Sequence, residues 1–289
     1  MKITHHLTNS LICLCILAAF SACKRAAKPL NVTKREGEGF TLFSKTVKDT
    51  FYISIQLPLD YRAQSKKRYS VVVVTDANFY YPMIAPILHQ YEKGGLLPPL
   101  ILVGIGYNSF KLMDSLRVRD YMYPKAIPSD EMKAVGGGQH FYQFITNELL
   151  PKVDSTYRTE TNNRTLLGHS FGGYFSLYAL MEQVDQKRND FKGFVSASPS
   201  LWYNNYYLFQ IPQKLKTLTR KDTLNLFLSV GGLEEPKWSI QPVKDLSKKF
   251  SDEGLNNMKV NTEIFNDLDH MDVGLISFVR GLEKMYVQN

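Results

Sequence analysis

Runs of apolar, largely β-branched residues recur along the chain, and they constrain its fold more than any other feature. In the segment YSVVVVTD at 69–76 the apolar positions are consecutive, which is typical of a strand buried on both faces of a sheet. Strands that alternate with helices predict an α/β fold whose mostly parallel central sheet carries helices on both faces. Similar runs stand at 100–107, 164–170, 191–199, 223–232 and, with more polar residues, 260–267; helical patterns between most of them stand at 82–91, 140–153, 172–183, 240–253 and 273–285.

Two segments of alternating hydrophobicity, at 40–47 and 50–58, precede this alternation. Their pattern predicts two antiparallel strands at one edge of the sheet. The chain has 289 residues, of which 44% are hydrophobic, which is enough for one sizeable core. No sign of a second domain is visible, so we expect a single domain over 40–289.

The stretch from 108 to 139 shows no clear periodicity and is expected to be an irregular loop insertion. Long irregular loops in compact domains are usually functional or disordered. If the segment is extended, Arg117 and Arg119 point the same way and suit anionic oxygens. Alternatively, the two arginines pair with a carboxylate such as Asp114 or Asp120 and only stiffen the loop. The side chains expected to face a ligand are Arg117, Arg119, Tyr121 and Tyr123.

The amino-terminal segment has the marks of an export signal. Lys2 precedes a short apolar run, and the small residues of FSAC follow it. The ending resembles the lipobox of bacterial lipoproteins, although Phe20 replaces the commoner leucine. We therefore expect residues 1–22 to be a lipoprotein-type signal peptide and Cys23 to be lipidated; the alternative is an ordinary signal peptide.

An exported, lipid-anchored protein also fits the cysteine count. Cys13 and Cys15 leave with the signal, so the mature chain keeps only Cys23 and has no disulfide. The polar, basic segment 23–39 is expected to be a tether. The net charge of +8 comes without a nucleic-acid motif, so we expect no nucleic-acid partner, and membrane contact only through the lipid anchor on the periplasmic or cell-surface side.

The sequence GHSFG at 168–172 ends one apolar run and opens a helical pattern. It fits G-x-S-x-G, in which a strand turns sharply into a helix and exposes a strained serine, Ser170, at the carboxyl edge of the sheet. Gly168 and Gly172 let the neighbouring backbone approach closely. A tight turn that merely contains a serine is the alternative, but the strand-then-helix context favours a nucleophile.

A serine at its ordinary pKa is a poor nucleophile and needs a base. In α/β-hydrolases the chain order is serine, acid, histidine, and His270 is the only one of six histidines that follows Ser170. His270 stands just after the last strand-like run, which predicts a loop at the same sheet edge. His169 is next to Ser170, but neighbours in a turn point in different directions, so it is expected to pack at the turn.

The acid of such a site should follow the strand-like run at 223–232. Glu234 and Glu235 both do, and a carboxylate there would orient His270 and stabilise its charged form. We prefer Glu234, with Glu235 second, and with Asp267 and Asp269 as a third option because they are near His270 in sequence.

A tetrahedral oxyanion needs two backbone donors. One is expected from the amide of Phe171, directly after the nucleophile. The other is expected from the loop after the run at 69–76, namely the amide of Asn78 or Ala77. No metal is expected, because the acidic cluster around His270 at 267–272 lacks paired-ligand spacing on a regular element.

Together these stretches resemble the esterase D-like family of α/β-hydrolases, which includes ferric-siderophore, feruloyl and acetyl xylan esterases. The resemblance spans most of 40–286. It implies the α/β-hydrolase fold and a Ser170, Glu234 and His270 triad, with Arg119 and Trp202 lining the substrate cleft. Some siderophore-type members lack a strong acid, so a Ser–His dyad stays open, and Ala77 replaces a more usual glycine. The matching stretches are VVVVTDANFYY, ILVGIGY, RVRDYMYP, LLGHSFGGYFSLYAL, FVSASPSLWY and DLDHMD.

These parts predict a cofactor-free serine carboxylic-ester hydrolase that works through an acyl-enzyme. Basic and aromatic residues in 108–139 favour an anionic or catecholic substrate such as a ferric siderophore lactone. A feruloyl or acetyl ester on a polysaccharide is the second possibility. A hydrolase-fold binding protein without turnover is a third, and the intact order of serine, acid and histidine argues against it.

Overall fold

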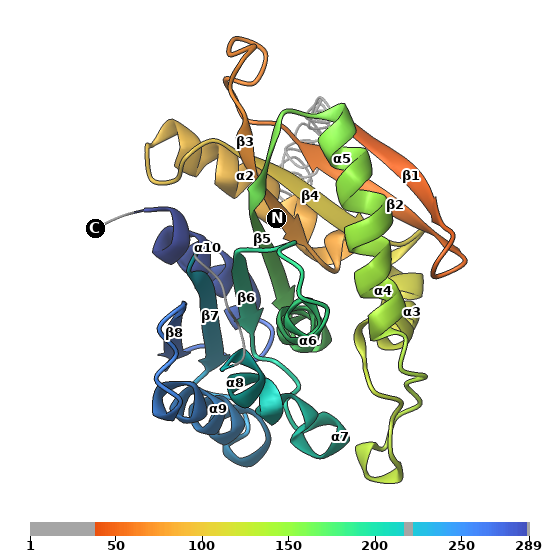
Figure 1. Ribbon diagram of the computed structural model, residues 1–289, viewed down its shortest axis with the longest axis vertical. Coiled ribbons are helices and arrows are strands. Elements are labelled where there is room, and N and C mark those ends of the chain that lie inside the picture. The colour runs from red at the N-terminus through yellow and green to blue at the C-terminus, as the bar shows by residue number, and fades with distance from the viewer. Residues whose placement is uncertain (1–37, 217–221, 288–289) are drawn as a thin grey trace, which may run out of the picture. The chain divides into compact units, whose positions relative to one another are not determined.

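The computed structural model describes residues 38–216 and 222–287, which belong to one compact unit, Gly37–Asn289. Within these residues, eight strands form a single sheet in the order β1-β2-β4-β3-β5-β6-β7-β8 (Figure 1). The predicted signal peptide, Cys23 and nearly all of the predicted tether lie outside the described residues.

The central strands are parallel, as the apolar runs predicted. Every residue of β3 and β4 is buried, because helices cover both faces of the sheet and leave no solvent-facing side. At the far edge, β8 has no fully buried residue. The parallel strands are β3 (Tyr69–Val74), β4 (Leu100–Gly106), β5 (Thr159–His169), β6 (Gly193–Ala197), β7 (Leu224–Gly231) and β8 (Met258–Phe265).

The predicted antiparallel pair is confirmed as β1 (Glu38–Ser44) and β2 (Asp49–Gln56). β2 also pairs antiparallel with β4, so the hairpin forms the other edge of the sheet. The result is a mixed, mostly parallel sheet of the α/β-hydrolase type.

Two hydrophobic cores lie on the two faces of the sheet. Val71 and Val73 face one core and Val72 and Val74 face the other, as alternation along a strand requires. The first core lies under α4 (Gly138–Phe144), α5 (Leu150–Thr156), α6 (Phe171–Asp185), α8 (Ile211–Leu215) and α9 (Gln241–Asp252), and the second under α2 (Ala77–Lys93) and α10 (Val273–Tyr286).

The expectation of an irregular loop over 108–139 is wrong for its first half. Phe110–Tyr121 forms the helix α3, Pro128–Asp130 is a short 3₁₀ turn, and α4 begins at Gly138. Helix α3 buries only Met113, Asp120 and Tyr121. It therefore lacks the continuous apolar stripe by which an amphipathic helix is recognised in a sequence, and one of its three buried residues is charged.

Candidate active site

Ser170 lies in a sharp turn between β5 and α6. Its backbone angles are φ 58° and ψ −117°, a strained conformation for a residue with a side chain. A Cβ atom at Gly168 would lie 1.9 Å from the carbonyl oxygen of Gly172, and one at Gly172 would lie 2.6 Å from Oγ1 of Thr75. Both positions therefore require glycine, which explains the spacing of the GHSFG motif.

His270 and Glu234 are joined at the same edge of the sheet. Nδ1 of His270 lies 2.8 Å from Oε2 of Glu234, and the other carboxylate oxygen accepts hydrogen bonds from the amide of Gly231, at 2.9 Å, and the hydroxyl of Ser198. Burial alone would raise the pKa of Glu234, but these donors outweigh burial and hold it below its ordinary value. The carboxylate is thus a fixed negative charge facing His270.

The other acidic candidates have different partners. Oδ1 of Asp269 accepts the amides of Met271 and Asp272, at 2.9 and 3.2 Å, and so shapes the loop that carries His270. Oε2 of Glu235 accepts the amide of Trp238 at 2.6 Å. Of Glu234, Glu235 and Asp269, only Glu234 is hydrogen-bonded to the ring of His270.

Ser170 follows β5 and His270 follows β8, so both lie at the carboxyl edge of the sheet. The serine is half-buried and the histidine side chain is 42% exposed, so both are accessible. Among the described residues, no hydrogen bond joins Ser170 to His270. Such bonds are often long in unliganded enzymes and tighten when substrate binds.

The amides expected to bind an oxyanion belong to first turns of helices. Phe171 opens α6, and Ala77 and Asn78 open α2, where backbone N–H groups have no acceptor within the helix. The side chain of Asn78 is fixed by Tyr107: its Nδ2 donates to the carbonyl of Tyr107 at 2.8 Å, and its Oδ1 accepts the Tyr107 amide at 2.7 Å. The first turn of α2 is therefore joined by two hydrogen bonds to the residue that follows β4.

Arg117 makes a buried ion pair beside this loop. Its guanidinium donates two hydrogen bonds to Asp76, at 2.9 and 2.7 Å, and a third to the carbonyl of His169 at 3.2 Å. Burial opposes the charge of Arg117, but Asp76 outweighs burial and the pKa of Arg117 is raised. The guanidinium of Arg117 is thus bound by groups of the protein itself. This matches the expected alternative in which the arginine pairs with a carboxylate and stiffens the segment, except that the carboxylate is Asp76 and not Asp114 or Asp120.

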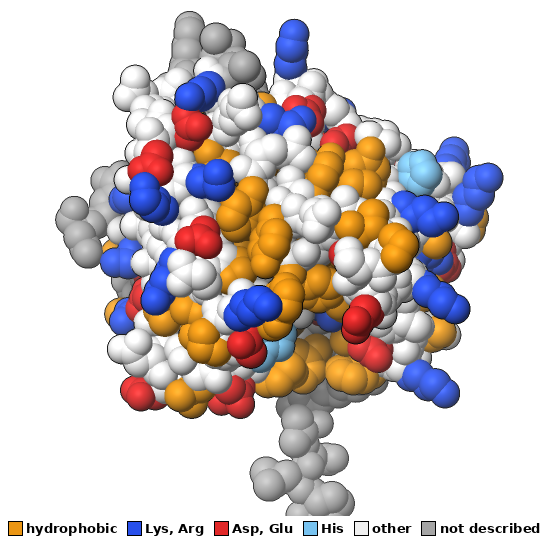
Figure 2. All heavy atoms as spheres, turned by 90° about the horizontal axis from the view of Figure 1, so that it is seen from below, with side chains coloured by type: hydrophobic (Ala, Val, Ile, Leu, Met, Phe, Trp, Pro, Cys, Tyr) orange, Lys and Arg blue, Asp and Glu red, His pale blue; other side chains and the backbone are white. Residues whose placement is uncertain are grey.

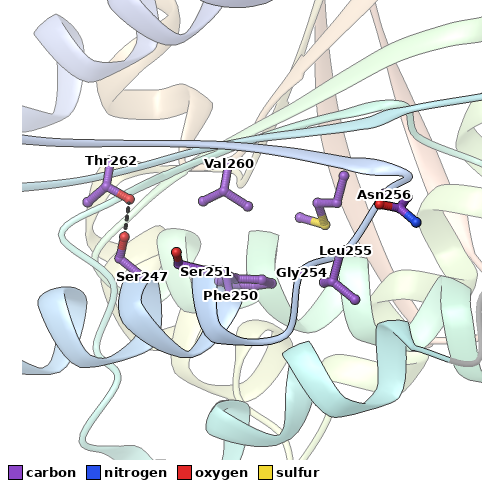
Figure 3. Close-up of a pocket in the computed structure, with 9 residues that line it drawn as sticks. Ser247, Phe250, Ser251, Gly254, Leu255, Asn256, Val260 and Thr262 are labelled. Atoms are coloured by element: carbon purple, nitrogen blue, oxygen red, sulfur yellow. Dashed lines mark hydrogen bonds between the residues drawn. The ribbon is translucent and has the colours of Figure 1, made fainter.

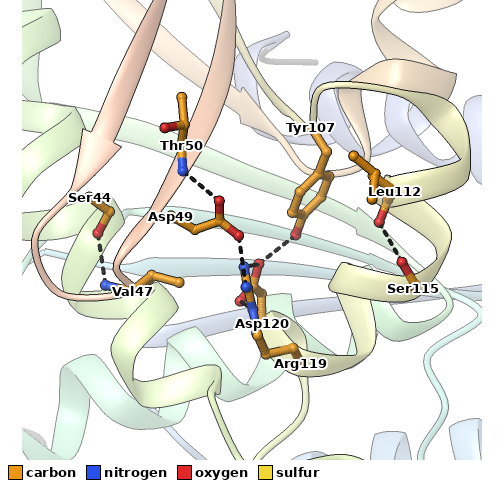
Figure 4. Close-up of polar contacts among 9 residues, drawn as sticks. All are labelled: Ser44, Val47, Asp49, Thr50, Tyr107, Leu112, Ser115, Arg119 and Asp120. Atoms are coloured by element: carbon orange, nitrogen blue, oxygen red, sulfur yellow. Dashed lines mark hydrogen bonds and ion pairs between the residues drawn. The ribbon is translucent and has the colours of Figure 1, made fainter.

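Arg119 points away from Arg117, because positions two apart on a helix are separated by about 200°. It forms ion pairs with Asp120 and with Asp49 at the start of β2, at 2.7 and 2.8 Å (Figure 4). The expectation that Tyr121 faces a ligand is wrong, because its side chain is fully buried and its hydroxyl accepts the amide of Asp76.

Exposed apolar side chains gather at the carboxyl edge of the sheet. Figure 2 views the molecule from that side and shows a broad band of hydrophobic atoms with charged side chains among and around them. Trp202 is half-buried and packs against the first core. The exposed apolar residues in the segments that follow β4, β7 and β8 include Phe110, Leu112, Leu233, Trp238 and Met271, and we call these five the apolar rim.

Two larger hollows lie away from Ser170 and His270. One of about 530 Å³ is between α9 and β8, where the hydroxyls of Ser247 and Thr262 are hydrogen-bonded at 2.7 Å (Figure 3). Another of about 1200 Å³ lies at the amino ends of the parallel strands, where Lys192, Thr223 and Lys259 line it together with the carboxyl end of α10. Neither includes Ser170 or His270, so volume alone does not locate the site.

Sequence reasoning missed two neighbours of the site. Ser198 adopts a left-handed conformation, φ 40°, that turns its hydroxyl onto Glu234. Its place at the end of the run at 191–199 would be the signal, since that puts it at the same sheet edge. The side chain of His169 contacts the carbonyl of His270, beyond the packing that was expected.

The described residues contain no group of three or more His, Cys, Asp or Glu side chains that could hold a metal ion. Across 38–216 and 222–287 no helix is both long enough and apolar enough to cross a membrane.

The arrangement is that of a serine hydrolase, and comparison with known proteins defines the class. Residues 44–257 match the protein family described as "Putative esterase". The match covers well over half of the chain, so the chain belongs to this esterase family.

Individual relatives refine this placement. The chain is 30% identical over 180 residues to the ferri-bacillibactin esterase BesA of Bacillus subtilis (strain 168), a match that covers 58% of this chain and 61% of BesA. Its fold resembles the BES protein from Bacillus cereus, with a TM-score of 0.76 at 22% identity over 88% of this chain and 96% of that one. It also resembles an IroE-like serine hydrolase from Shewanella oneidensis, with a TM-score of 0.73 at 25% identity over 87% and 80%.

Proposed function

We propose that the chain hydrolyses small-molecule esters with Ser170 as nucleophile, His270 as base and Glu234 as the acid that orients His270. The observation that carries this proposal is the strained Ser170 at the same sheet edge as His270, whose ring is hydrogen-bonded to the buried Glu234. A histidine held by a carboxylate at Nδ1 presents Nε2 to a serine hydroxyl in the correct tautomer.

The steps follow from the positions of these groups. Ser170 Oγ attacks the ester carbonyl while His270 Nε2 takes its proton, and the amides of Phe171 and Asn78 hold the oxyanion. The tetrahedral intermediate collapses, the ester C–O bond breaks, and His270 returns the proton to the leaving alcohol. Water then attacks the acyl-serine with His270 as base, which releases the acid and restores Ser170.

Replacement of the nucleophile tests the proposal directly. Ser170→Ala should lower kcat for p-nitrophenyl acetate by about 10³-fold or more, because the acyl-enzyme can no longer form, while circular dichroism and Tm stay close to wild type. A fluorophosphonate probe should label Ser170 in the wild type and nothing in the variant. Activity that survives the change would contradict the assignment, and the absence of turnover in the wild type would favour a binding protein.

For the substrate, we favour a siderophore lactone. Support comes from the siderophore esterase relatives, and from the apolar rim, whose aromatic members suit catecholic rings. The experiment is a hydrolysis panel that compares ferric and iron-free siderophore lactones with feruloyl and acetylated sugars. A higher kcat/KM for the sugar esters would overturn this choice and leave the serine mechanism intact.

The site of action is proposed from the sequence alone. The FSAC motif supports export and lipidation at Cys23. The expressed protein should fractionate with membranes in a bacterium that processes lipoproteins, and Cys23→Ser should release it or block its maturation. An unmodified amino terminus at another residue, found by mass spectrometry, would refute the anchor.

A further inference from the structure

The ring of His169 is buried and directed at the loop that carries His270. The residue is only 4% exposed, and its Nε2 lies 2.7 Å from the carbonyl oxygen of His270. A carbonyl can only accept a hydrogen bond, so Nε2 of His169 carries the proton. The contact joins residues that are 101 positions apart in the chain, and one of them precedes Ser170 directly.

Neighbouring groups leave the His169 ring little freedom. The ring of Tyr80 meets it edge-on at 5.8 Å, and the ring of His270 lies 4.6 Å away. On the side of α10, a Cβ atom at Gly274 would lie 3.1 Å from Cγ of His169 and 2.4 Å from the hydroxyl oxygen of Tyr80. The donor is therefore held in one direction by three elements: α2, α10 and the His270 loop.

The backbone of the same residue is fixed as well. The carbonyl of His169 accepts a hydrogen bond from Arg117, and the amide of Ser170 donates to the carbonyl of Ala197 at 3.0 Å. His169 thus lies at the end of a central strand, tied to α3 by its backbone and to the His270 loop by its side chain.

We infer that His169 is a positioning residue that sets His270 relative to Ser170. This inference rests on the proposed function. His270 is held at two points, its carbonyl oxygen by His169 and its Nδ1 by Glu234, and these two contacts define where the remaining ring nitrogen lies. Because His169 is covalently next to Ser170, its hydrogen bond to the His270 carbonyl links the backbone of the nucleophile to that of the base.

A neutral donor suits this place. His270 gains a proton during each half-reaction, and a second positive ring 4.6 Å away would oppose that step. Burial, together with the nearby His270, lowers the pKa of His169 to about 3, so it stays uncharged at neutral pH. Arg117 acts in the same direction, whereas the hydrogen bond to the His270 carbonyl and the charge of Glu234 oppose it.

The test uses two substitutions at 169 in two backgrounds. His169→Phe keeps a ring but removes the donor, and His169→Gln keeps an N–H donor. With p-nitrophenyl acetate, His169→Phe should lower kcat about 10- to 100-fold with KM within about twofold, because a small misplacement of a catalytic group costs rate rather than binding. His169→Gln should recover most of that loss.

The same substitutions in a His270→Ala background identify the route of the effect. A residue that acts through His270 should cause no further loss of the residual rate there, whereas one that only supports the fold should cause the same loss in both backgrounds. Gly274→Ala gives a second perturbation. Its Cβ would press on the Tyr80 hydroxyl and on the His169 ring and should lower kcat several-fold, and the variant serves if His169→Phe does not fold.

Two results would overturn the inference: a kcat for His169→Phe within twofold of wild type, or equal losses with and without His270. Either could occur while Ser170→Ala is still inactive, in which case the proposed function stands and only the role of His169 falls. If Ser170→Ala keeps its activity, the proposed function itself fails.

Discussion

The two sides of Ser170 each hold a buried carboxylate, but they give it different partners. After β7, Glu234 faces His270; on the side of α3, Asp76 faces Arg117, and both carboxylate side chains are 3% exposed. Histidine gains and loses a proton near neutral pH, whereas arginine stays charged. The first pair is therefore suited to proton transfer and the second to holding the turn before α2 in place.

The first prediction concerns the proton-transfer side and is the largest effect. Glu234→Gln should lower kcat on the order of 10³-fold, because His270 loses the charge that orients and stabilises it, yet the amide oxygen still accepts from Ser198 and Gly231. Steady-state kinetics of Glu235→Gln provides the matched control, with little change expected. If both are silent and Asp269→Asn is not, the acid is misassigned; if all three are silent, the site works as a Ser–His dyad.

The second prediction concerns the arginine side. Arg117→Met should lower the free energy of unfolding by about 3–5 kcal/mol, because Asp76 is left buried without its partner. Arg280→Met is the matched control: its ion pair with Glu283 is exposed and should contribute less than about 1 kcal/mol. Urea unfolding followed by circular dichroism measures both. Equal losses in the two variants would show that the Arg117–Asp76 pair is not a structural brace.

The third prediction is smaller and concerns pH. The unfolded chain protonates His169 near its ordinary pKa of 6.5, while the folded pKa is about 3. The free energy of unfolding should therefore fall as the pH drops below about 6.5, by at most ~1.4 kcal/mol per pH unit. Above that pH, His169 is neutral in both states and should not change the free energy of unfolding. Glu234 adds its own loss only below its ordinary pKa of 4.5.

The comparison of Tm at pH 7.5 and pH 5 measures this effect, and the comparison of the wild type with His169→Phe separates it from every other group that titrates between these pH values. His169→Phe should show a smaller drop in Tm between the two pH values than the wild type does. An unchanged drop would mean that His169 is protonated in the folded state as readily as in the unfolded chain.

The strands and the longest helices were predictable because burial on both faces of a parallel sheet leaves uninterrupted apolar runs, as in β3 and β4. The helix α3 was not, because its buried face contains Asp120, and Arg117 beside it pairs with Asp76; a charge neutralised by a partner 41 residues away has no periodic signature. The segment 203–215 was missed for another reason: Asn204 and Asn205 are left-handed and break the helical pattern.

In the candidate site, Ser170, Glu234 and His270 were predicted as a group because each follows a strand-like run, and parallel strands end at one edge. Their contacts could not be predicted at that level. Three features depend on packing between elements that are distant in the chain: the hydrogen bond from Ser198 to Glu234, the ion pair of Arg117 with Asp76, and the burial of Tyr121.

The position of β8 has a consequence for the order in which activity and structure are lost on heating. The strand is the outermost of its side, none of its residues is fully buried, and it leads into the loop that carries His270. Edge elements with few buried contacts open locally at a lower free energy than the central strands do. Local unfolding of β8 would displace the proposed base, His270, while Ser170 stays in place at the end of a central strand. We therefore expect activity to disappear on heating before the helical signal in circular dichroism does.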